Sequence, residues 1–323
     1  MRRALGLVYA AVLWAAAPLW GQEAPFLALP LDCLPGESCY IEDYFDRVEE
    51  TGLGDYTCGI KTRDGHRGTD FALTNWVTYE NGVNVLAAAP GIVEATRDGM
   101  EDRQYSEDNA EKVGGRECGN AVRIRHENGL QTLYCHLRQG SVAVRPGDVA
   151  ERGTVLGKIG MSGKTNYPHV HLSVLDDGTH LDPFAPNAAE TCGETDETLW
   201  LDPLAYTKTG MFTAGFSDIV PDFADVKSGA ARRLEITATQ PLVLYTHFFH
   251  AQVGDVLTLQ VAGPEGSVFE NTETLDAPKR SQFQAYGRKA PADGWAQGTY
   301  RGTATLQRDG QTLAVRFTEV TVR

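Results

Sequence analysis

The feature that most constrains the fold is a pair of short apolar segments joined by a turn signal. Residues 119–126 read Gly-Asn-Ala-Val-Arg-Ile-Arg-His and residues 130–136 read Leu-Gln-Thr-Leu-Tyr-Cys-His, with Glu-Asn-Gly between them. Alternating side chains around Asn-Gly are typical of a β-hairpin. The chain is therefore expected to contain antiparallel sheet. Its 34 glycines and 15 prolines agree with a protein of strands and turns.

Short segments of strand-like composition occur in two groups along the chain. The first group lies at 83–88, 91–95, 121–126, 130–137, 154–159 and 169–175. The second group lies at 234–239, 242–247, 256–261, 299–306 and 312–322. About 100 residues of short strands in the second group predict a small β-sandwich. The expected fold class is thus mainly β, with an antiparallel sheet domain followed by a smaller β-sandwich-like domain.

The N-terminus has the layout of a secretory signal peptide. Arg2 and Arg3 precede an apolar run over 4–19, and small and polar residues follow at 21–23. A membrane anchor is the alternative, but the run is short for a span of roughly 20 residues. We therefore expect no membrane span after signal cleavage. The sequence predicts a signal peptide at 1–21, a lead-in at 22–57, a first domain at 58–185, a linker at 186–210 and an accessory domain at 211–323.

Two stretches of the first domain look like insertions, at 74–82 and 97–117. The longer one is rich in Asp, Glu, Arg and Gly. A solvated loop and a lid over a functional site are both consistent with that composition.

The charge of the chain argues against nucleic acid as a partner. It carries 43 acidic residues against 29 basic ones, a formal net charge of −14, and no cluster of Lys and Arg. Phosphate contacts require such clusters.

Six cysteines in an exported chain suggest disulfide bonds: Cys33, Cys39, Cys58, Cys118, Cys135 and Cys192. Cys33 and Cys39 are close in sequence and are expected to close a small loop. The other four allow three pairings. The pairing of Cys118 with Cys135 is disfavoured by hairpin register. Across a two-residue turn these cysteines are offset by about four residues along the strands, which is too far for a disulfide unless the chain bends.

Three short motifs contain residues that bind metals or transfer protons. His66 and Asp70 form HxxxD after Asp64-Gly65, His136 ends the second hairpin segment, and His169 and His171 form HxH. Residues two apart in a strand share a face, so His169 and His171 are expected to point the same way. Each motif alone is weak, but their conjunction in this order within one domain is specific. Structural roles, and not metal binding or catalysis, are expected for the remaining histidines, which are His126, His180, His247 and His250.

This set of motifs resembles the M23 metallopeptidases, also called the lysostaphin or LytM type. The resemblance covers about residues 58–184. It includes Gly-His-Arg-Gly-Thr-Asp-Phe at 65–71, Ala-Ala-Ala-Pro-Gly-Ile-Val at 87–93, Gly-Asn-Ala-Val at 119–122, Leu-Tyr-Cys-His-Leu at 133–137, Gly-Met-Ser-Gly at 160–163 and Pro-His-Val-His-Leu at 168–172.

The resemblance implies roles for five residues. His66, Asp70 and His171 would be the ligands of one Zn²⁺ per chain, and His136 and His169 would be catalytic. Three protein ligands leave a fourth position for water, as in catalytic zinc sites generally. The chain has no HExxH helix to supply a glutamate base, so a histidine must take that part.

The resemblance also implies a function, a zinc-dependent endopeptidase that cuts peptide cross-links of bacterial peptidoglycan. The signal peptide and the cysteines fit a periplasmic protein, with secretion as the alternative. A second hypothesis is a metal-binding but occluded regulator or activator of other cell-wall hydrolases. A peptidase for protein substrates is a third. The accessory domain is expected to bind the wall, bind a protein partner or buttress the first domain.

Overall fold

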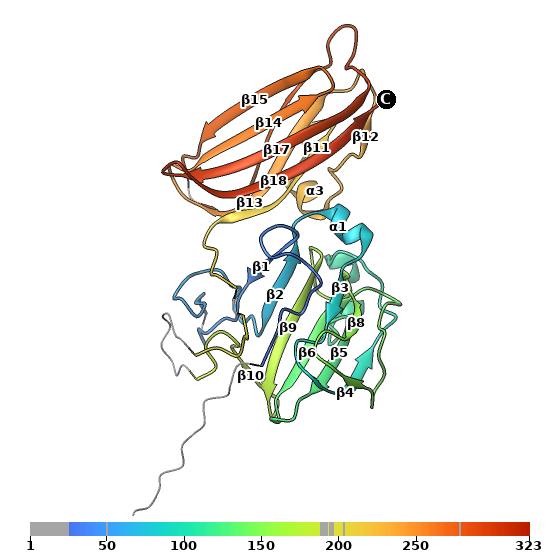
Figure 1. Cartoon of the computed structure of the whole chain (residues 1–323), viewed down its shortest axis with the longest axis vertical. Helices are drawn as coiled ribbons and strands as arrows, with labels where there is room; N and C mark the ends of the chain where they lie inside the picture. Colours follow the sequence, from blue (N-terminus) through green and yellow to red (C-terminus); the bar gives the residue numbers. More distant parts are fainter. Residues whose placement is uncertain (1–25, 50, 188–192, 194–196, 203, 278) are drawn as a thin grey trace, which may run out of the picture.

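The computed structural model describes residues 26–49, 51–187, 193, 197–202, 204–277 and 279–323. The expected signal peptide at 1–21 and Cys192 lie outside these ranges. None of the helices within them has the length and apolar character needed to traverse a bilayer. Two lobes follow one another along the long axis of the molecule (Figure 1). We call the described residues from 26 to 202 the first lobe and those from 204 onward the second lobe.

The first lobe is built on one antiparallel sheet. The strand order is β1-β2-β9-β6-β5-β4-β7, and β10 pairs with β9. A separate ladder joins β3 to β8. The elements are β1 (Cys39–Asp43), β2 (Thr69–Leu73), α1 (Trp76–Asn81), β3 (Asn84–Leu86), β4 (Gly91–Arg97), η1 (Glu107–Asn109), α2 (Ala110–Val113), β5 (Asn120–Arg125), β6 (Gln131–Leu137), β7 (Val149–Ala150), β8 (Val155–Lys158), β9 (His169–Asp176) and β10 (Thr179–Leu181).

Alternation along β9 separates the two faces of this sheet. Val170, Leu172 and Val174 are buried in the hydrophobic core of the first lobe. His169 and His171 point to the opposite face, because neighbouring side chains in a strand project in opposite directions. The apolar face of the sheet is covered partly by residues that precede and follow the strands, including Leu27, Leu31 and Trp200.

The second lobe is a two-layer β-sandwich, as expected. One sheet has the order β11-β13-β16 and the other the order β12-β18-β17-β14-β15. Apolar side chains from both sheets, such as Phe216, Leu244, Leu259 and Ala304, form its core. The elements are β11 (Gly210–Ser217), α3 (Phe223–Ser228), β12 (Glu235–Ile236), β13 (Leu242–Ala251), β14 (Val256–Gly263), β15 (Gly266–Thr274), β16 (Lys279–Arg288), β17 (Gly298–Arg308) and β18 (Gln311–Val322).

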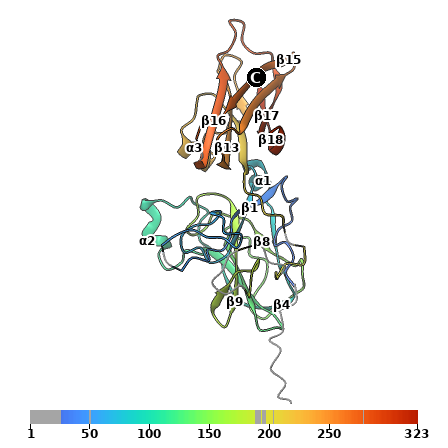
Figure 2. The same cartoon turned by 90° about the vertical axis from the view of Figure 1, so that its left-hand side faces the viewer.

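A small aromatic cluster joins the two lobes. Tyr40, Ala72 and Tyr167 of the first lobe pack against Phe212 and Phe249 of the second. The rings of Tyr40 and Phe249 stack with their centroids 5.9 Å apart. Helices α1 and α3 also lie at this junction (Figures 1 and 2). Ala72 pairs with His169 in the sheet, so the second lobe is seated near the histidine-bearing strands.

The two expected insertions have local structure. Residues 74–82 contain α1, whose first turn is capped by Asn75, which accepts a hydrogen bond from the backbone N–H of Thr78. Residues 97–117 contain η1 and α2. The carboxylate of Asp102 accepts a hydrogen bond from the backbone N–H of Met161. The longer insertion is therefore bonded to the loop that precedes β9.

The structure corrects the expectation about Cys118 and Cys135, which form a disulfide with Cα atoms 4.8 Å apart. The pairing of β5 with β6 slips by one residue between Asn120 and Val122. His136 and Gly119 both have positive φ, so each strand bends at this point. The bend brings Cys118 back toward Cys135, a condition that a straight hairpin does not meet. Cys33 and Cys39 form the expected small loop, and Cys58 is also disulfide-bonded.

Removing the Cys118–Cys135 bond should measurably lower stability. The bond closes a loop of 17 residues, and the loop-entropy model gives such a loop about 3 kcal/mol. We expect the Cys118→Ser, Cys135→Ser double variant to lose about that much free energy of unfolding in urea. The Cys33→Ser, Cys39→Ser double variant is the matched control and should lose less, because its loop spans 6 residues. An equal or larger loss in the control would contradict this account.

Candidate metal centre

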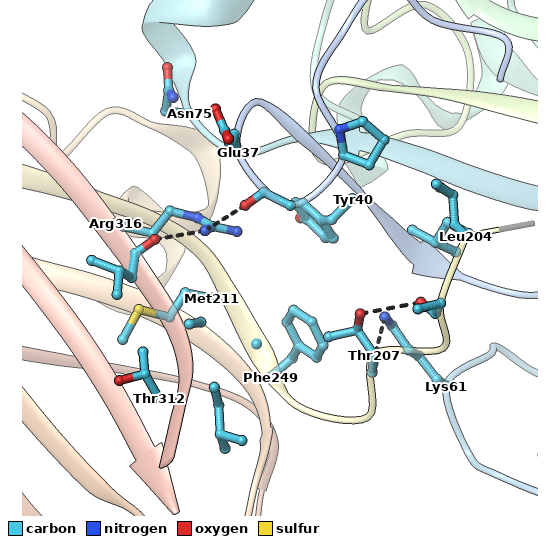
Figure 3. A pocket seen from close by; sticks show the side chains of 18 of the residues that line it. Glu37, Tyr40, Lys61, Asn75, Leu204, Thr207, Met211, Phe249, Thr312 and Arg316 are labelled. Atoms are coloured by element: carbon cyan, nitrogen blue, oxygen red, sulfur yellow. Dashed lines mark hydrogen bonds between the residues drawn. The ribbon is translucent and has the colours of Figure 1, made fainter. Parts of the chain in front are cut away.

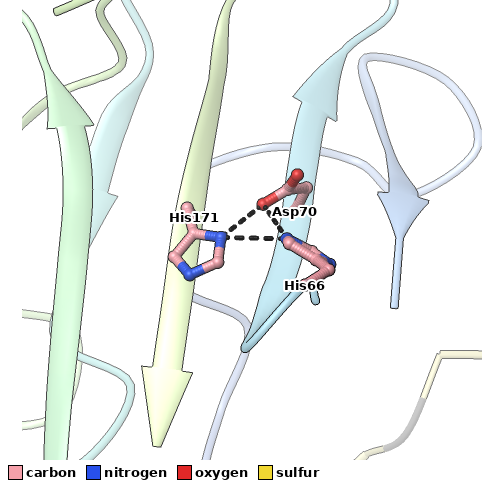
Figure 4. A group of neighbouring side chains, drawn as sticks. All are labelled: His66, Asp70 and His171. Carbon is pink, nitrogen blue, oxygen red and sulfur yellow. Dashed lines mark hydrogen bonds and ion pairs between the residues drawn. The ribbon is translucent and has the colours of Figure 1, made fainter. Parts of the chain in front are cut away.

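Two neighbouring strands bring a carboxylate and an imidazole together. Asp70 on β2 pairs directly with His171 on β9. His66 lies in the turn before β2, four residues earlier in the chain. One ligand atom from each of His66, Asp70 and His171 lies within 4.8 Å of the others. Figure 4 shows the three side chains directed toward a common point.

Hydrogen bonds on the outer side of each imidazole fix which nitrogen faces this point. Nδ1 of His66 donates to the carbonyl oxygen of Tyr44 at 2.6 Å, so Nε2 keeps its lone pair. The hydroxyl of Ser173 donates to the carbonyl oxygen of Arg67 and lies 2.9 Å from Nε2 of His171. Ser173 therefore accepts from Nε2, and Nδ1 of His171 keeps its lone pair. Such outer partners are a regular feature of metal-bound histidines.

The carboxylate of Asp70 is 1% exposed and is held as an anion. Its Oδ1 lies 3.1 Å from Nε2 of His66 and 2.7 Å from Nδ1 of His171. Its Oδ2 is paired with the guanidinium of Arg63, which also reaches Asp43 at 2.7 Å. Burial alone would raise the pKa of Asp70, but His66 and Arg63 outweigh it, and the pKa lies well below the usual range.

These three groups fit a catalytic zinc ion. Zinc accepts imidazole nitrogen and carboxylate oxygen, and two histidines with one carboxylate form a known catalytic ligand set. Nε2 of His66 and Nδ1 of His171 are 3.1 Å apart. Ligand atoms about 2.1 Å from a tetrahedral ion lie about 3.4 Å apart, so the distance between these two nitrogens needs to increase only slightly. Burial lowers the pKa of His66, but Asp70 outweighs that effect and raises it overall. A bound cation would replace the proton.

Two further imidazoles lie beside the triad. The rings of His136 and His169 have centroids 4.7 Å apart, and His136 lies 6.2 Å from His171. Nδ1 of His136 donates to the carbonyl oxygen of Ser162 at 2.8 Å, and Nδ1 of His169 donates to that of Tyr167 at 2.8 Å. Nε2 of His169 has no hydrogen-bond partner among the described residues.

Burial favours the neutral form of both of these imidazoles. Burial is the largest cause that lowers the pKa of His136 well below its ordinary value, and the neighbouring His169 and His171 add to it. Burial also lowers the pKa of His169, against the opposing effect of Asp70. A neutral imidazole whose Nε2 has no hydrogen-bond partner among the described residues, as in His169, has a lone pair available for a proton.

The close approach of the chain to His171 requires glycine at position 68. A Cβ built on Gly68 would lie 2.5 Å from Nε2 of His171 and 2.6 Å from the carbonyl oxygen of Leu172. Any larger residue would displace the strand that carries the triad. The Gly in the HxxxD motif therefore has a steric reason that the spacing of the ligands does not reveal.

The structure gathers all five predicted site residues and leaves the other histidines elsewhere. His126 bonds to Pro90 and Thr132 at the hairpin end, and His247 bonds to Ser281 in the second lobe. Sequence analysis missed Arg63 and Ser173. Ser173 follows His171 by two residues on one strand, so alternation carried a signal for it. Arg63 lies in a loop, and no spacing rule marked it.

The side chains of the site are largely buried. The side chain of His171 is 16% exposed, whereas those of His66 and His169 are 6% and 5% exposed. The 97–117 segment lies at the rim, where the backbone N–H of Tyr105 donates to the carbonyl oxygen of Thr165. The carbonyl oxygen of Cys118, at the end of that segment, accepts from the N–H of His136. The segment thus supports the loop and strand that carry His169 and His136.

This region is similar to known proteins. Residues 64–183 match Peptidase family M23. The peptidoglycan DD-endopeptidase ShyC of Vibrio cholerae is 31% identical over 136 residues, which is 41% of this chain and 26% of that protein. The DD-carboxypeptidase/endopeptidase Mpg of Neisseria meningitidis is 43% identical over 67 residues, 21% of this chain and 15% of that protein. The chain thus spans about a quarter or less of the length of these curated relatives.

Part of the chain also matches a solved structure, at lower sequence identity. The catalytic domain of the antimicrobial peptidase lysostaphin from Staphylococcus simulans is 20% identical. The match covers 44% of this chain and 85% of that one, with a TM-score of 0.28.

Metal binding should depend on the triad and not on histidine content. We expect the His171→Ala variant to lose its divalent metal ion after dialysis, because two remaining ligands do not hold zinc firmly. The His126→Gln variant is the matched control and should retain the metal. Elemental analysis of the dialysed full chain measures both. Retention of a full equivalent by His171→Ala would show that the metal lies elsewhere.

Proposed function

We propose that this chain, whose residues 64–183 form a peptidase family M23 domain, is a zinc-dependent endopeptidase that hydrolyses peptide cross-links of bacterial peptidoglycan. The observation that carries the proposal is the convergence of His66, Asp70 and His171 beside two neutral imidazoles. His66, Asp70 and His171 would hold the ion. His136 and His169 would act on the reacting atoms.

Nε2 of His169 has no hydrogen-bond partner among the described residues, which suits it to proton transfer, and the ring of His136 lies beside it. Bound zinc would polarise the scissile carbonyl and lower the pKa of the attacking water. Nε2 of either histidine can take the proton of that water as its oxygen adds to the carbonyl carbon. The resulting imidazolium then gives the proton to the amide nitrogen as the C–N bond breaks. The backbone carbonyls that hold both Nδ1–H groups keep the rings in this orientation.

The names of the relatives favour one class of substrate bond. ShyC is named a DD-endopeptidase, and Mpg a DD-carboxypeptidase/endopeptidase. We propose that this chain also cuts a bond formed by D-alanine in a cross-link, in preference to a glycine bridge. The signal-peptide layout and the disulfides support activity in the periplasm.

A regulator with an occluded site is the second candidate. Low exposure of the imidazoles and the pairing of Arg63 with Asp70 favour it. Deleting residues 97–117 is a poor test, because Asp102 and Cys118 support the site loop and His136. Digestion by the full chain decides between the two candidates.

Zinc content and digestion of purified peptidoglycan should separate metal binding from catalysis. We expect wild type to contain zinc and to release un-cross-linked muropeptides. The His169→Ala and His136→Ala variants should keep zinc but cut about 10²- to 10⁴-fold more slowly, because each removes a proton acceptor. The His126→Gln variant should cut like wild type.

Mass spectrometry of the released muropeptides identifies the bond. Products ending in D-alanine support the proposal, whereas products ending in glycine would reassign the substrate. Zinc-loaded wild type that releases no product would favour the occluded regulator.

A further inference from the structure

A cavity of about 850 Å³ lies between the lobes. Two smaller spaces also have walls from both lobes, one near Arg63 and one that Lys61 also lines. The walls of the first cavity come from β1 and Lys61 in the first lobe and from β13 and β18 in the second. Figure 3 shows Arg316 and Lys61 on opposite sides of it. Its volume falls within the range of about 300–1,000 Å³ that is usual for ligand sites.

The wall contains a buried lysine that has no carboxylate partner in the described chain. Lys61 is 2% exposed, and its Nζ donates to a single acceptor, the carbonyl oxygen of Thr207 at 2.9 Å. An ammonium group has three donors. Nζ also lies 4.6 Å from the centroid of the Phe249 ring. Burial lowers the pKa of Lys61 to about 8, although Asp43, Glu42 and Asp55 oppose the shift. Buried ammonium groups are normally paired.

The second cation of the wall is also without an ion pair in the described chain. Nη1 of Arg316 donates to the carbonyl oxygens of Val315 and Gly36, at 2.8 and 3.3 Å. Its Nε is buried and has no acceptor among the described residues. Glu37 is the acidic residue in this wall, and it is exposed.

The remaining wall is largely apolar. Met211, Phe249 and Leu204 contribute side chains to it, and the ring of Tyr40 lies beside them. A ligand that satisfies this surface needs an anionic group for the cations and small apolar groups for the rest. A peptide that ends in a carboxylate has both.

We propose that the interlobe cavity binds the free carboxylate end of a short peptide, with Arg316 as the carboxylate-binding residue and Lys61, on the opposite wall, as a donor to a carbonyl oxygen of the same peptide. Resting on the proposed function, the source of that peptide is an uncut stem peptide of the same wall. The ligand would touch both lobes and fix their relative position. Tyr44 also lines the cavity, and its carbonyl oxygen holds His66. The bound peptide would therefore lie next to the metal centre without occupying it.

Calorimetric titration of the zinc-loaded full chain tests the site. The probes are N-acetyl-trialanine with a free C-terminal carboxylate and the same peptide as its C-terminal amide. We expect the carboxylate to bind and the amide to bind at least about tenfold more weakly, because charge-assisted hydrogen bonds are lost. Arg316→Gln and Lys61→Met should each weaken carboxylate binding by about tenfold or more. Arg301→Gln, on the neighbouring strand β17 and outside the cavity, is the matched control and should leave it unchanged.

Two further titrations distinguish binding in this cavity from binding at the metal centre and from general anion binding. The His171→Ala variant should still bind the carboxylate, and loss of binding there would place the ligand on the metal and overturn the proposal. Inorganic phosphate should compete poorly, and equal binding of phosphate would reduce the site to a general anion site.

The proposal also fails if the amide binds as well as the carboxylate, if Arg316→Gln binds like wild type, or if no carboxylate binds. If the Lys61→Met variant does not fold, the Arg316→Gln variant still tests the proposal, because Arg316 is partly exposed. None of these measurements requires cleavage, so an inactive enzyme would leave the result interpretable.

Discussion

The buried carboxylate of Asp70 is the group on which the rest of the site depends. It accepts contacts from His66, His171 and Arg63, and an unpaired carboxylate at this depth would be very costly. Cations must therefore surround it. The sheet supplies the geometry, because direct pairing of β2 with β9 sets Asp70 beside His171. A divalent metal ion bound by these groups would replace any proton on the imidazoles and add positive charge beside the carboxylate. The site is thus suited to a divalent cation before any function is considered.

The part of the site that sequence predicted is the part that obeys local rules. HxxxD, a strand-borne His136 and HxH are short patterns, and strand alternation correctly placed His169 and His171 on one face. What sequence missed depends on contacts between distant segments. Arg63 lies in a loop whose path is set by its own ion pairs with Asp70 and Asp43. No periodicity marks such a residue, because its role is fixed by tertiary structure.

The same distinction holds for the fold. The strongly alternating strands of both lobes were predicted, and the β-sandwich was recognised from them. Several strands were not predicted, including β1, β11, β15 and β16. In β11 all residues are buried, and no polar face alternates with an apolar one. The Cys118–Cys135 bond was disfavoured because straight strands were assumed. Positive φ at Gly119 and at His136 changes the path of both strands. A residue other than glycine at positive φ is uncommon and is kept where surrounding structure fixes it. Here the disulfide and the bond from His136 to Ser162 do so.

The position of the second lobe follows from which face of the sheet it covers. Tyr40 and Ala72 are a cross-strand pair on β1 and β2, and Ala72 shares its face with Asp70 two residues earlier. The aromatic cluster that joins the lobes therefore lies on the face that carries Asp70 and His171. A second cavity, of about 210 Å³, has Arg63 in one wall and His247 of the second lobe in the other. Arg63, which forms an ion pair with Asp70, therefore faces the second lobe across this cavity. The relative position of the lobes thus affects the surroundings of a residue that touches the triad.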